Sequence, residues 1–228
     1  MSVRFHWHGH SAWTIEAGGK KILVDPFLTG NPTADIGPDQ AEADFILLTH
    51  AHGDHLGDTV AIAKRTGAPV VTNNEIAIWL SKQGIENAVG LNPGGHFALP
   101  VCRLMYTFAI HSSSFPDGTY GGVAGGFMMY FDGLTVYNSG DTALFSDMAL
   151  FGERYKPDLA MLCIGDHFTM GPDDSIAALK MLKAEYVLPQ HYNTFPPIQQ
   201  DANAWAEKVR HLGVQPTVLQ PGGEYTSK

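Results

Sequence analysis

The stretch Thr49-His50-Ala51-His52-Gly53-Asp54-His55 places three imidazoles and one carboxylate within six residues. Such groups are costly to desolvate together unless a cation binds them. Neutral imidazole and carboxylate are also the ligands that first-row divalent metals prefer. The stretch follows a continuous apolar run, Phe45 to Leu48, which predicts a buried strand. We therefore expect a metal site on the loop that leaves the carboxyl end of this strand.

The spacing within this stretch predicts two ions. Residues two apart in an extended loop point the same way, so His50 and His52 can bind one ion together. Asp54 and His55 follow the small Gly53 and must turn elsewhere, which suits a second ion. This pattern differs from the helical His-Glu-x-x-His motif, in which residues four apart share one face.

Two ions need more ligands than this stretch supplies, and three further residues lie where ligands are expected. His111, Asp141 and His191 each come shortly after an apolar run that predicts a strand. A histidine at a strand end is more often a hydrogen-bonding residue than a ligand, but the 49–55 cluster requires partners. The three predicted strands are Tyr106–Ile110, Leu134–Asn138 and Tyr186–Gln190.

Strands dominate the remaining pattern, and helices follow them in each half of the chain. The sequence predicts further strands over Val3–Trp7, Ala12–Glu16, Lys21–Val24, Asp44–Leu48, Val70–Val71, Phe127–Phe131, Leu159–Ile164 and Thr217–Leu219. It predicts helices over Thr59–Arg65, Asn73–Lys82, Ser146–Arg154, Asp173–Lys183 and Ala202–Leu212. This order predicts an α/β (α+β) fold in which two mixed sheets face each other with helices outside, a four-layer αββα sandwich. Because no linker-like stretch divides the halves, we expect one domain over residues 1–228.

Composition narrows the classes of partner. A 44% hydrophobic and 16% charged chain is typical of a globular protein. The formal net charge of −9 disfavours a nucleic-acid-binding protein. The two cysteines, Cys102 and Cys163, lie in apolar runs and are expected to be buried thiols. Neither a signal-peptide pattern nor an 18-residue apolar span is seen, so we expect no membrane contact and a cytoplasmic location. The sequence is compatible with a homo-oligomer.

At this point the motifs resemble a known family. The Thr49–His55 stretch, His111, the Ser139-Gly140-Asp141-Thr142 pattern and His191 resemble the signature of the metallo-β-lactamase superfamily in order and spacing. More narrowly, the chain is similar to a bacterial branch of metal-dependent hydrolases related to the lactonase that acts on phosphorylated ascorbate. The motifs that carry this narrower resemblance are Gly9-His10-Ser11-Ala12, Leu23-Val24-Asp25-Pro26, His111-Ser112-Ser113-Ser114 and the Ile164–Pro172 segment.

The resemblance implies the metallo-β-lactamase fold and a role for each site residue. The first ion would be bound by His50, His52 and His111, the second by Asp54, His55 and His191, with Asp141 bridging. Asp25 would orient the histidine-rich loop from behind, and His10 would line the pocket. Two positions depart from the branch, because His8 replaces a commonly apolar residue and His167 a common asparagine. We expect His8 to form a hydrogen bond on a strand face and place His167 in a loop at the pocket.

The predicted function is a dinuclear hydrolase in which a metal-bridging hydroxide attacks a small-molecule ester, lactone or phosphorylated metabolite. Asp141 would fix the bridge, and Asp54 would accept or relay a proton. Zinc is the default metal and manganese its main competitor, with nickel and iron also open. The alternatives are a phosphodiesterase or nuclease of the same superfamily and a non-catalytic metal-binding member. A flavodiiron oxidoreductase, a glyoxalase II and an exported β-lactamase fit less well.

Overall fold

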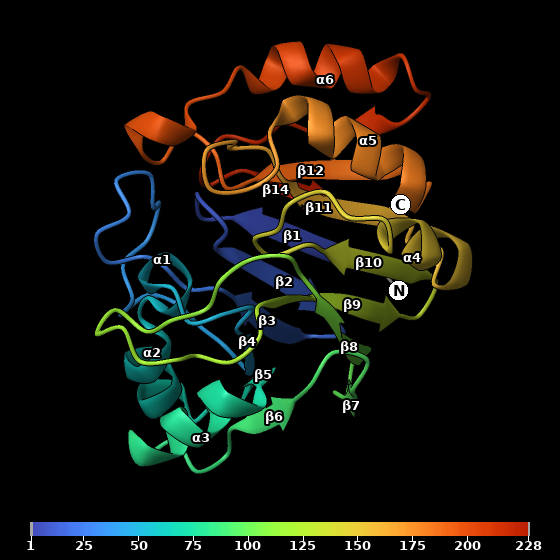
Figure 1. Ribbon diagram of the computed structural model, residues 1–228. Coiled ribbons are helices and arrows are strands. Elements are labelled where there is room, and N and C mark those ends of the chain that lie inside the picture. The colour runs from blue at the N-terminus through green and yellow to red at the C-terminus, as the bar shows by residue number, and fades with distance from the viewer. Residues whose placement is uncertain (1, 228) are drawn as a thin grey trace.

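The computed structural model describes residues 2–227 and contains two mixed β-sheets packed face to face (Figure 1). The first sheet has the order β14-β1-β2-β3-β4-β5-β6. Its strands are β1 (Val3–Trp7), β2 (Trp13–Ala17), β3 (Lys20–Val24), β4 (Phe45–Leu47), β5 (Val70–Asn73), β6 (Val89–Leu91) and β14 (Glu224–Thr226). The pairs from β14 to β3 are antiparallel, whereas those from β3 to β6 are parallel.

The second sheet repeats this change of direction in the order β13-β12-β11-β10-β9-β8-β7. Its strands are β7 (His96–Ala98), β8 (Arg103–Phe108), β9 (Gly125–Phe131), β10 (Leu134–Asn138), β11 (Leu159–Cys163), β12 (Tyr186–Gln190) and β13 (Gln215–Pro216). Strands β7 to β10 pair antiparallel, and β10 to β13 pair parallel. Parallel strands bring their carboxyl ends to one edge of a sheet, so both sheets present loops there.

Helices cover the outer faces of both sheets, which completes the predicted four-layer αββα sandwich (Figure 1). Beside the first sheet lie α1 (Gly53–Leu56), α2 (Thr59–Thr66) and α3 (Asn74–Lys82). Beside the second lie α4 (Met148–Arg154), α5 (Pro172–Leu182) and α6 (Ala202–Arg210), and a 3₁₀ turn, η1, spans Pro196–Ile198. Asn73 caps α3, because its side chain accepts a hydrogen bond from the Ile76 N–H.

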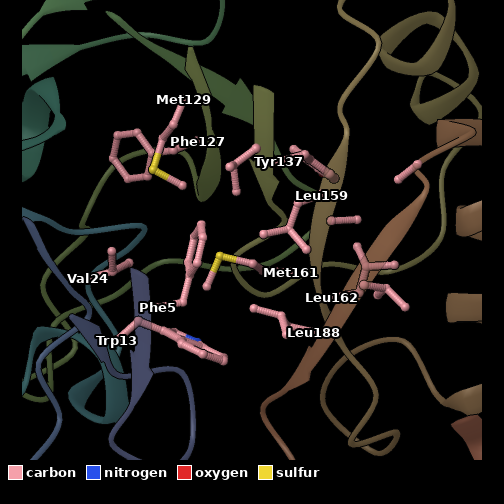
Figure 2. Close-up of a cluster of buried hydrophobic side chains, with 14 of the residues drawn as sticks. Phe5, Trp13, Val24, Phe127, Met129, Tyr137, Leu159, Met161, Leu162 and Leu188 are labelled. Carbon is pink, nitrogen blue, oxygen red and sulfur yellow. The ribbon is translucent and has the colours of Figure 1, made fainter. Parts of the chain in front are cut away.

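The main core lies between the sheets (Figure 2). Period-two alternation in β1 turns Val3, Phe5 and Trp7 inward and leaves Arg4 and His6 on the outer face. A polar contact also joins the layers, since Trp13 Nε1 donates to Gln190 Oε1 over 2.9 Å. A second cluster, which includes Leu23, Ile46 and Leu80, packs the first sheet against its helices.

Most predicted elements form within one to three residues of their expected ends, but one predicted strand is wrong. Residues 217–219 are not a strand: the ladder beside β12 ends at Pro216, and the Thr217 N–H makes a last bond to the Val187 carbonyl oxygen at 3.0 Å. The last strand is β14, which turns back after Gly222-Gly223 to pair with β1. Both cysteines are free and buried, as expected. No helix among residues 2–227 is long and apolar enough to cross a membrane.

Candidate metal centre

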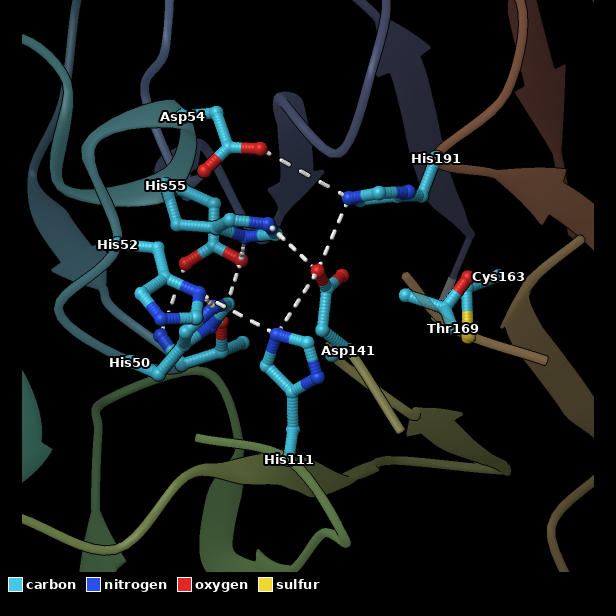
Figure 3. A network of polar contacts seen from close by, with 12 residues as sticks. His50, His52, Asp54, His55, His111, Asp141, Cys163, Thr169 and His191 are labelled. Carbon is cyan, nitrogen blue, oxygen red and sulfur yellow. Dashed lines mark hydrogen bonds and ion pairs between the residues drawn. The ribbon is translucent and has the colours of Figure 1, made fainter. Parts of the chain in front are cut away.

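Seven side chains predicted as ligands lie together at the carboxyl ends of strands from both sheets (Figure 3). The histidine-rich loop follows β4, and its extended part ends where α1 begins at Gly53. His111 follows β8, Asp141 follows β10 and His191 follows β12. The contact between the two sheets therefore assembles residues that lie up to 141 positions apart, from His50 to His191.

The first half of the cluster consists of His50, His52 and His111. His52 Nδ1 lies 3.0 Å from His50 Nε2 and 3.2 Å from His111 Nε2. Nitrogens that ligate zinc at ~2.0–2.1 Å in a tetrahedral arrangement lie roughly 3.3 Å apart. Both distances from His52 Nδ1 are close to that value, and the three ligand atoms lie within 4.8 Å of one another.

The second half consists of Asp54, His55 and His191, with His10 beside them. Asp54 Oδ2 lies 3.9 Å from His191 Nε2 and 3.2 Å from His10 Nε2. Asp54 is on the first turn of α1, so the helix turns it and His55 away from His52. This is the divergence that the spacing beyond Gly53 predicts.

Asp141 lies between the two halves. Its Oδ2 is 2.9 Å from His191 Nε2, 3.2 Å from His55 Nε2 and 3.6 Å from His111 Nε2. Gly140 makes this placement possible: its φ is +55°, and a side chain there would meet the Gly125 carbonyl oxygen at 2.4 Å.

Asp25 lies behind the cluster and contacts one half directly and the other through Thr49. Its carboxylate accepts hydrogen bonds from His55 Nδ1 at 2.8 Å, from the Thr49 N–H at 2.8 Å and from Thr49 Oγ1 at 2.7 Å. Thr49 Oγ1 in turn lies 3.0 Å from His50 Nδ1. Asp25 thereby orients one imidazole in each half, which is the position proposed for it from the sequence.

The electrostatics of the cluster fit bound cations. Burial lowers the pKa of His50 well below its usual range and also lowers those of His52 and His111, so all three imidazoles are neutral. Burial alone would lower the pKa of His55, but Asp141 and Asp25 outweigh it and raise that pKa well above its usual value. The two buried carboxylates thus favour positive charge beside them.

Two buried polar atoms at the centre of the cluster also lack a hydrogen-bond partner among the described residues. Within residues 2–227, neither His55 Nε2 nor Asp141 Oδ1 has a hydrogen-bond partner. Native structures rarely leave such atoms unsatisfied, and a metal ion would satisfy both. The donor set therefore fits divalent cations held by nitrogen and oxygen ligands.

The structure places the two proposed pocket residues, His10 and His167, in different surroundings. His10 is fully buried, and its ring lies 4.1 Å from that of His191. His167 lies on an exposed turn, where its ring packs 4.4 Å from that of Phe168. Sequence reasoning missed Thr194, whose Oγ1 lies 2.8 Å from His10 Nδ1. No sequence signal links Thr194 to His10, because the two residues are 184 positions apart.

A two-sheet sandwich with a His/Asp cluster at its strand ends defines a protein of the metallo-β-lactamase type. The family model described as a β-lactamase superfamily domain matches residues 4–191. A UPF0173 metal-dependent hydrolase of Thermus thermophilus is 50% identical over 220 residues, which cover 96% of this chain and 97% of that relative. Another from Methanopyrus kandleri is 43% identical over 228 residues, covering 98% and 99%.

A solved structure agrees with these relatives. Igni18, a metallo hydrolase of the archaeon Ignicoccus hospitalis, has a TM-score of 0.92 and 38% identity, covering 100% of this chain and 99% of its own. The chain belongs to the β-lactamase superfamily and, within it, to the UPF0173 metal-dependent hydrolases. The family resemblance and the fold class predicted from the sequence are confirmed.

Proposed function

We propose that this chain is a dinuclear hydrolase acting on a small-molecule ester, lactone or phosphorylated metabolite. The observation that carries the proposal is the position of the Asp141 carboxylate, within 3.6 Å of imidazoles from both halves of the cluster. A carboxylate placed between two ligand groups can contact two ions at once. In this scheme His50, His52 and His111 would hold one ion and Asp54, His55 and His191 the other, with the Asp141 carboxylate between the two groups.

Divalent ions bound there would supply an activated water nucleophile near neutral pH and stabilise the charge that develops on the substrate oxygen. Zinc is the first expectation, because imidazole and carboxylate are the proposed ligands and neither cysteine nor methionine is among them. Manganese is the main competitor, and nickel and iron can use the same donors.

Asp54 is the residue that we assign to proton transfer. Burial would raise its pKa, but the hydrogen bond from His10 and the nearby His55 outweigh burial and hold the pKa well below its usual value. Burial lowers the pKa of His10 to about 4, so its ring is neutral near pH 7. His10 Nε2–H then donates to Asp54 Oδ2, while His10 Nδ1 accepts from the Thr194 hydroxyl. His10 is thus a positioning residue that fixes the Asp54 carboxylate.

The surroundings of His10 favour a small substrate. Phe27 and Phe195 pack edge-on against the ring at 5.7 and 5.5 Å, which limits water on this side of the cluster. The 14 Lys and Arg against 23 Asp and Glu leave little basic surface for a nucleic acid. The two buried free thiols suit a reducing compartment such as the cytoplasm.

Metal removal and a two-substrate comparison test the proposal. The protein would be stripped with a chelator, reconstituted with zinc or manganese, and assayed on a panel of lactones and on bis(p-nitrophenyl) phosphate. We expect turnover of lactones only after reconstitution, and its loss in Asp141→Asn. The matched control is His96→Gln, which changes an exposed histidine on β7 and should retain full activity.

Each result has a distinct meaning. Full turnover in the metal-free protein would refute the metal-dependent scheme. Turnover of the phosphodiester alone would assign the chain to the phosphodiesterases. If the reconstituted protein binds two ions and hydrolyses neither substrate class, the result favours the non-catalytic alternative.

A further inference from the structure

A second group of metal-binding side chains lies on the outer face of the first sheet. His6 is on β1 and His8 directly follows this strand, so the two rings lie on the same face, opposite Phe5 and Trp7. Asp35, from the segment between β3 and β4, reaches both rings. Its Oδ2 is 2.7 Å from His6 Nε2, and its Oδ1 is 2.7 Å from His8 Nδ1. One ligand atom from each residue lies within 4.8 Å of the others.

Each imidazole in this group has its other nitrogen held by an oxygen atom. His8 Nε2 lies 2.8 Å from Thr14 Oγ1, and His6 Nδ1 lies 3.2 Å from Glu224 Oε1. Histidines that ligate metals typically donate their remote N–H to such an oxygen, which fixes the tautomer and the ring orientation. The supporting partners of a metal site are therefore already in place around both rings.

The two carboxylates beside His6 call for positive charge on this group. His6 has a carboxylate oxygen at each ring nitrogen, which either an imidazolium with two N–H donors or a bound cation balances. With a cation between His6 and Asp35, the neutral ring would donate its single N–H to Glu224. Burial lowers the pKa of His8, which keeps that ring neutral and available as a ligand.

We propose that His6, His8 and Asp35 form a peripheral divalent-metal site that ties the segment between β3 and β4 to the first sheet. Two imidazoles and a carboxylate are a donor set for zinc, with nickel and copper as competitors. A cavity of about 190 Å³ is lined by His6, His8 and Thr14.

A metal ion at this site would stabilise the segment between β3 and β4, which packs beside the central cluster. At Gly9, which has a φ of +91°, a side chain would meet Thr33 Oγ1 at 2.4 Å, so the tied segment packs directly on the chain between His8 and His10. The same segment begins near Phe27, whose ring packs 5.7 Å from that of His10. An ion at Asp35 would therefore hold the middle of this segment against His6 and His8, close to the chain that leads to His10.

Metal counting on matched variants tests this proposal. The whole protein would be equilibrated with zinc, and bound metal measured by mass spectrometry for wild type, Asp35→Asn, His6→Gln and the control His96→Gln. We expect each cluster variant to bind one equivalent fewer than wild type and the control to lose none. Thr14→Val should weaken binding of that equivalent by roughly tenfold, because it removes a supporting contact of His8.

Anomalous diffraction at the zinc edge from wild-type crystals gives a measurement that does not depend on how the variants fold. A peak between His6, His8 and Asp35 is expected. Equal metal content in wild type and folded variants, or the absence of this peak, would overturn the proposal. His6, His8 and Asp35 would then be joined by hydrogen bonds only. The metal content of the variants and the anomalous peak both report on this site alone. They therefore test this proposal independently of what the central cluster binds or hydrolyses.

Discussion

Replacing Asp25 with asparagine should weaken both halves of the central cluster. The Asp25 side chain is 1% exposed, and its two oxygens accept three hydrogen bonds from Thr49 and His55. Because Thr49 also contacts His50, one carboxylate orients an imidazole in each half. Asparagine has nearly the same volume but only one acceptor oxygen, so at least one donor would face an NH₂ group.

Two independent estimates of the effect agree. A hydrogen bond to a charged group contributes ~1.5–3 kcal/mol, and here the His55 bond to Asp25 loses its charged acceptor. Residues that support metal-ligating histidines typically change metal affinity by ~10–100-fold, which is about 1.4–2.7 kcal/mol at 1.36 kcal/mol per factor of ten. We therefore expect Asp25→Asn to weaken binding of each ion by roughly tenfold to a hundredfold.

Competition with a chromophoric chelator would measure both affinities. Thr49→Val is the matched comparison, since it removes the hydroxyl that contacts His50 but keeps the bond between Asp25 and His55. It should weaken chiefly the ion held with His50. If Asp25→Asn folds normally and binds both ions within twofold of wild type, the carboxylate does not orient the cluster and the reasoning fails.

Three further changes have expected outcomes. Removing metal should lower the thermal midpoint, because an ion at a hundred times its Kd stabilises the native state by ~2.7 kcal/mol; re-adding zinc should restore the midpoint in a calorimetric scan. Since the pKa of His55 lies well above its usual value, an incoming ion must displace a proton there. Affinity measured from pH 6 upward should rise by up to ~tenfold per unit until that pKa is passed, whereas a flat profile would contradict this. Met161→Ala, in the core between the sheets, should cost ~2–5 kcal/mol in urea unfolding.

The sequence predicted the elements whose pattern is local. The strand predicted over Val3–Trp7 has both ends correct, and the apolar run before His50 predicted β4 to within one residue at each end. The spacing around Gly53 also predicted that His52 and Asp54 diverge, which the start of α1 explains. In each case neighbouring residues carry the signal, because period and turn chemistry are properties of a short stretch.

Long-range pairing could not be predicted in the same way. Strand β14 is three residues long, and it forms because β1 offers a free edge 224 positions away, between Val3 and Ser227. The contact between Thr194 and His10, and that between Asp35 and His8, likewise depend on how distant loops meet. For His167 the loop was predicted correctly, but its exposure follows from a turn with positive φ at Asp166 and His167.

The same backbone conformation recurs at residues that the central cluster needs. His10, Asp25 and His191 have φ values of +54°, +42° and +55°, a region that side chains with a Cβ rarely adopt. Each such residue costs on the order of 1–3 kcal/mol, so the surrounding structure must hold it there. Asp25 is held by three hydrogen bonds, and the His191 N–H donates to the carbonyl oxygen of His10 at 2.9 Å. The sharp turns that follow β3 and β12 thus direct these side chains into the cluster, while the buried layers between the sheets supply the stability that keeps the turns in place.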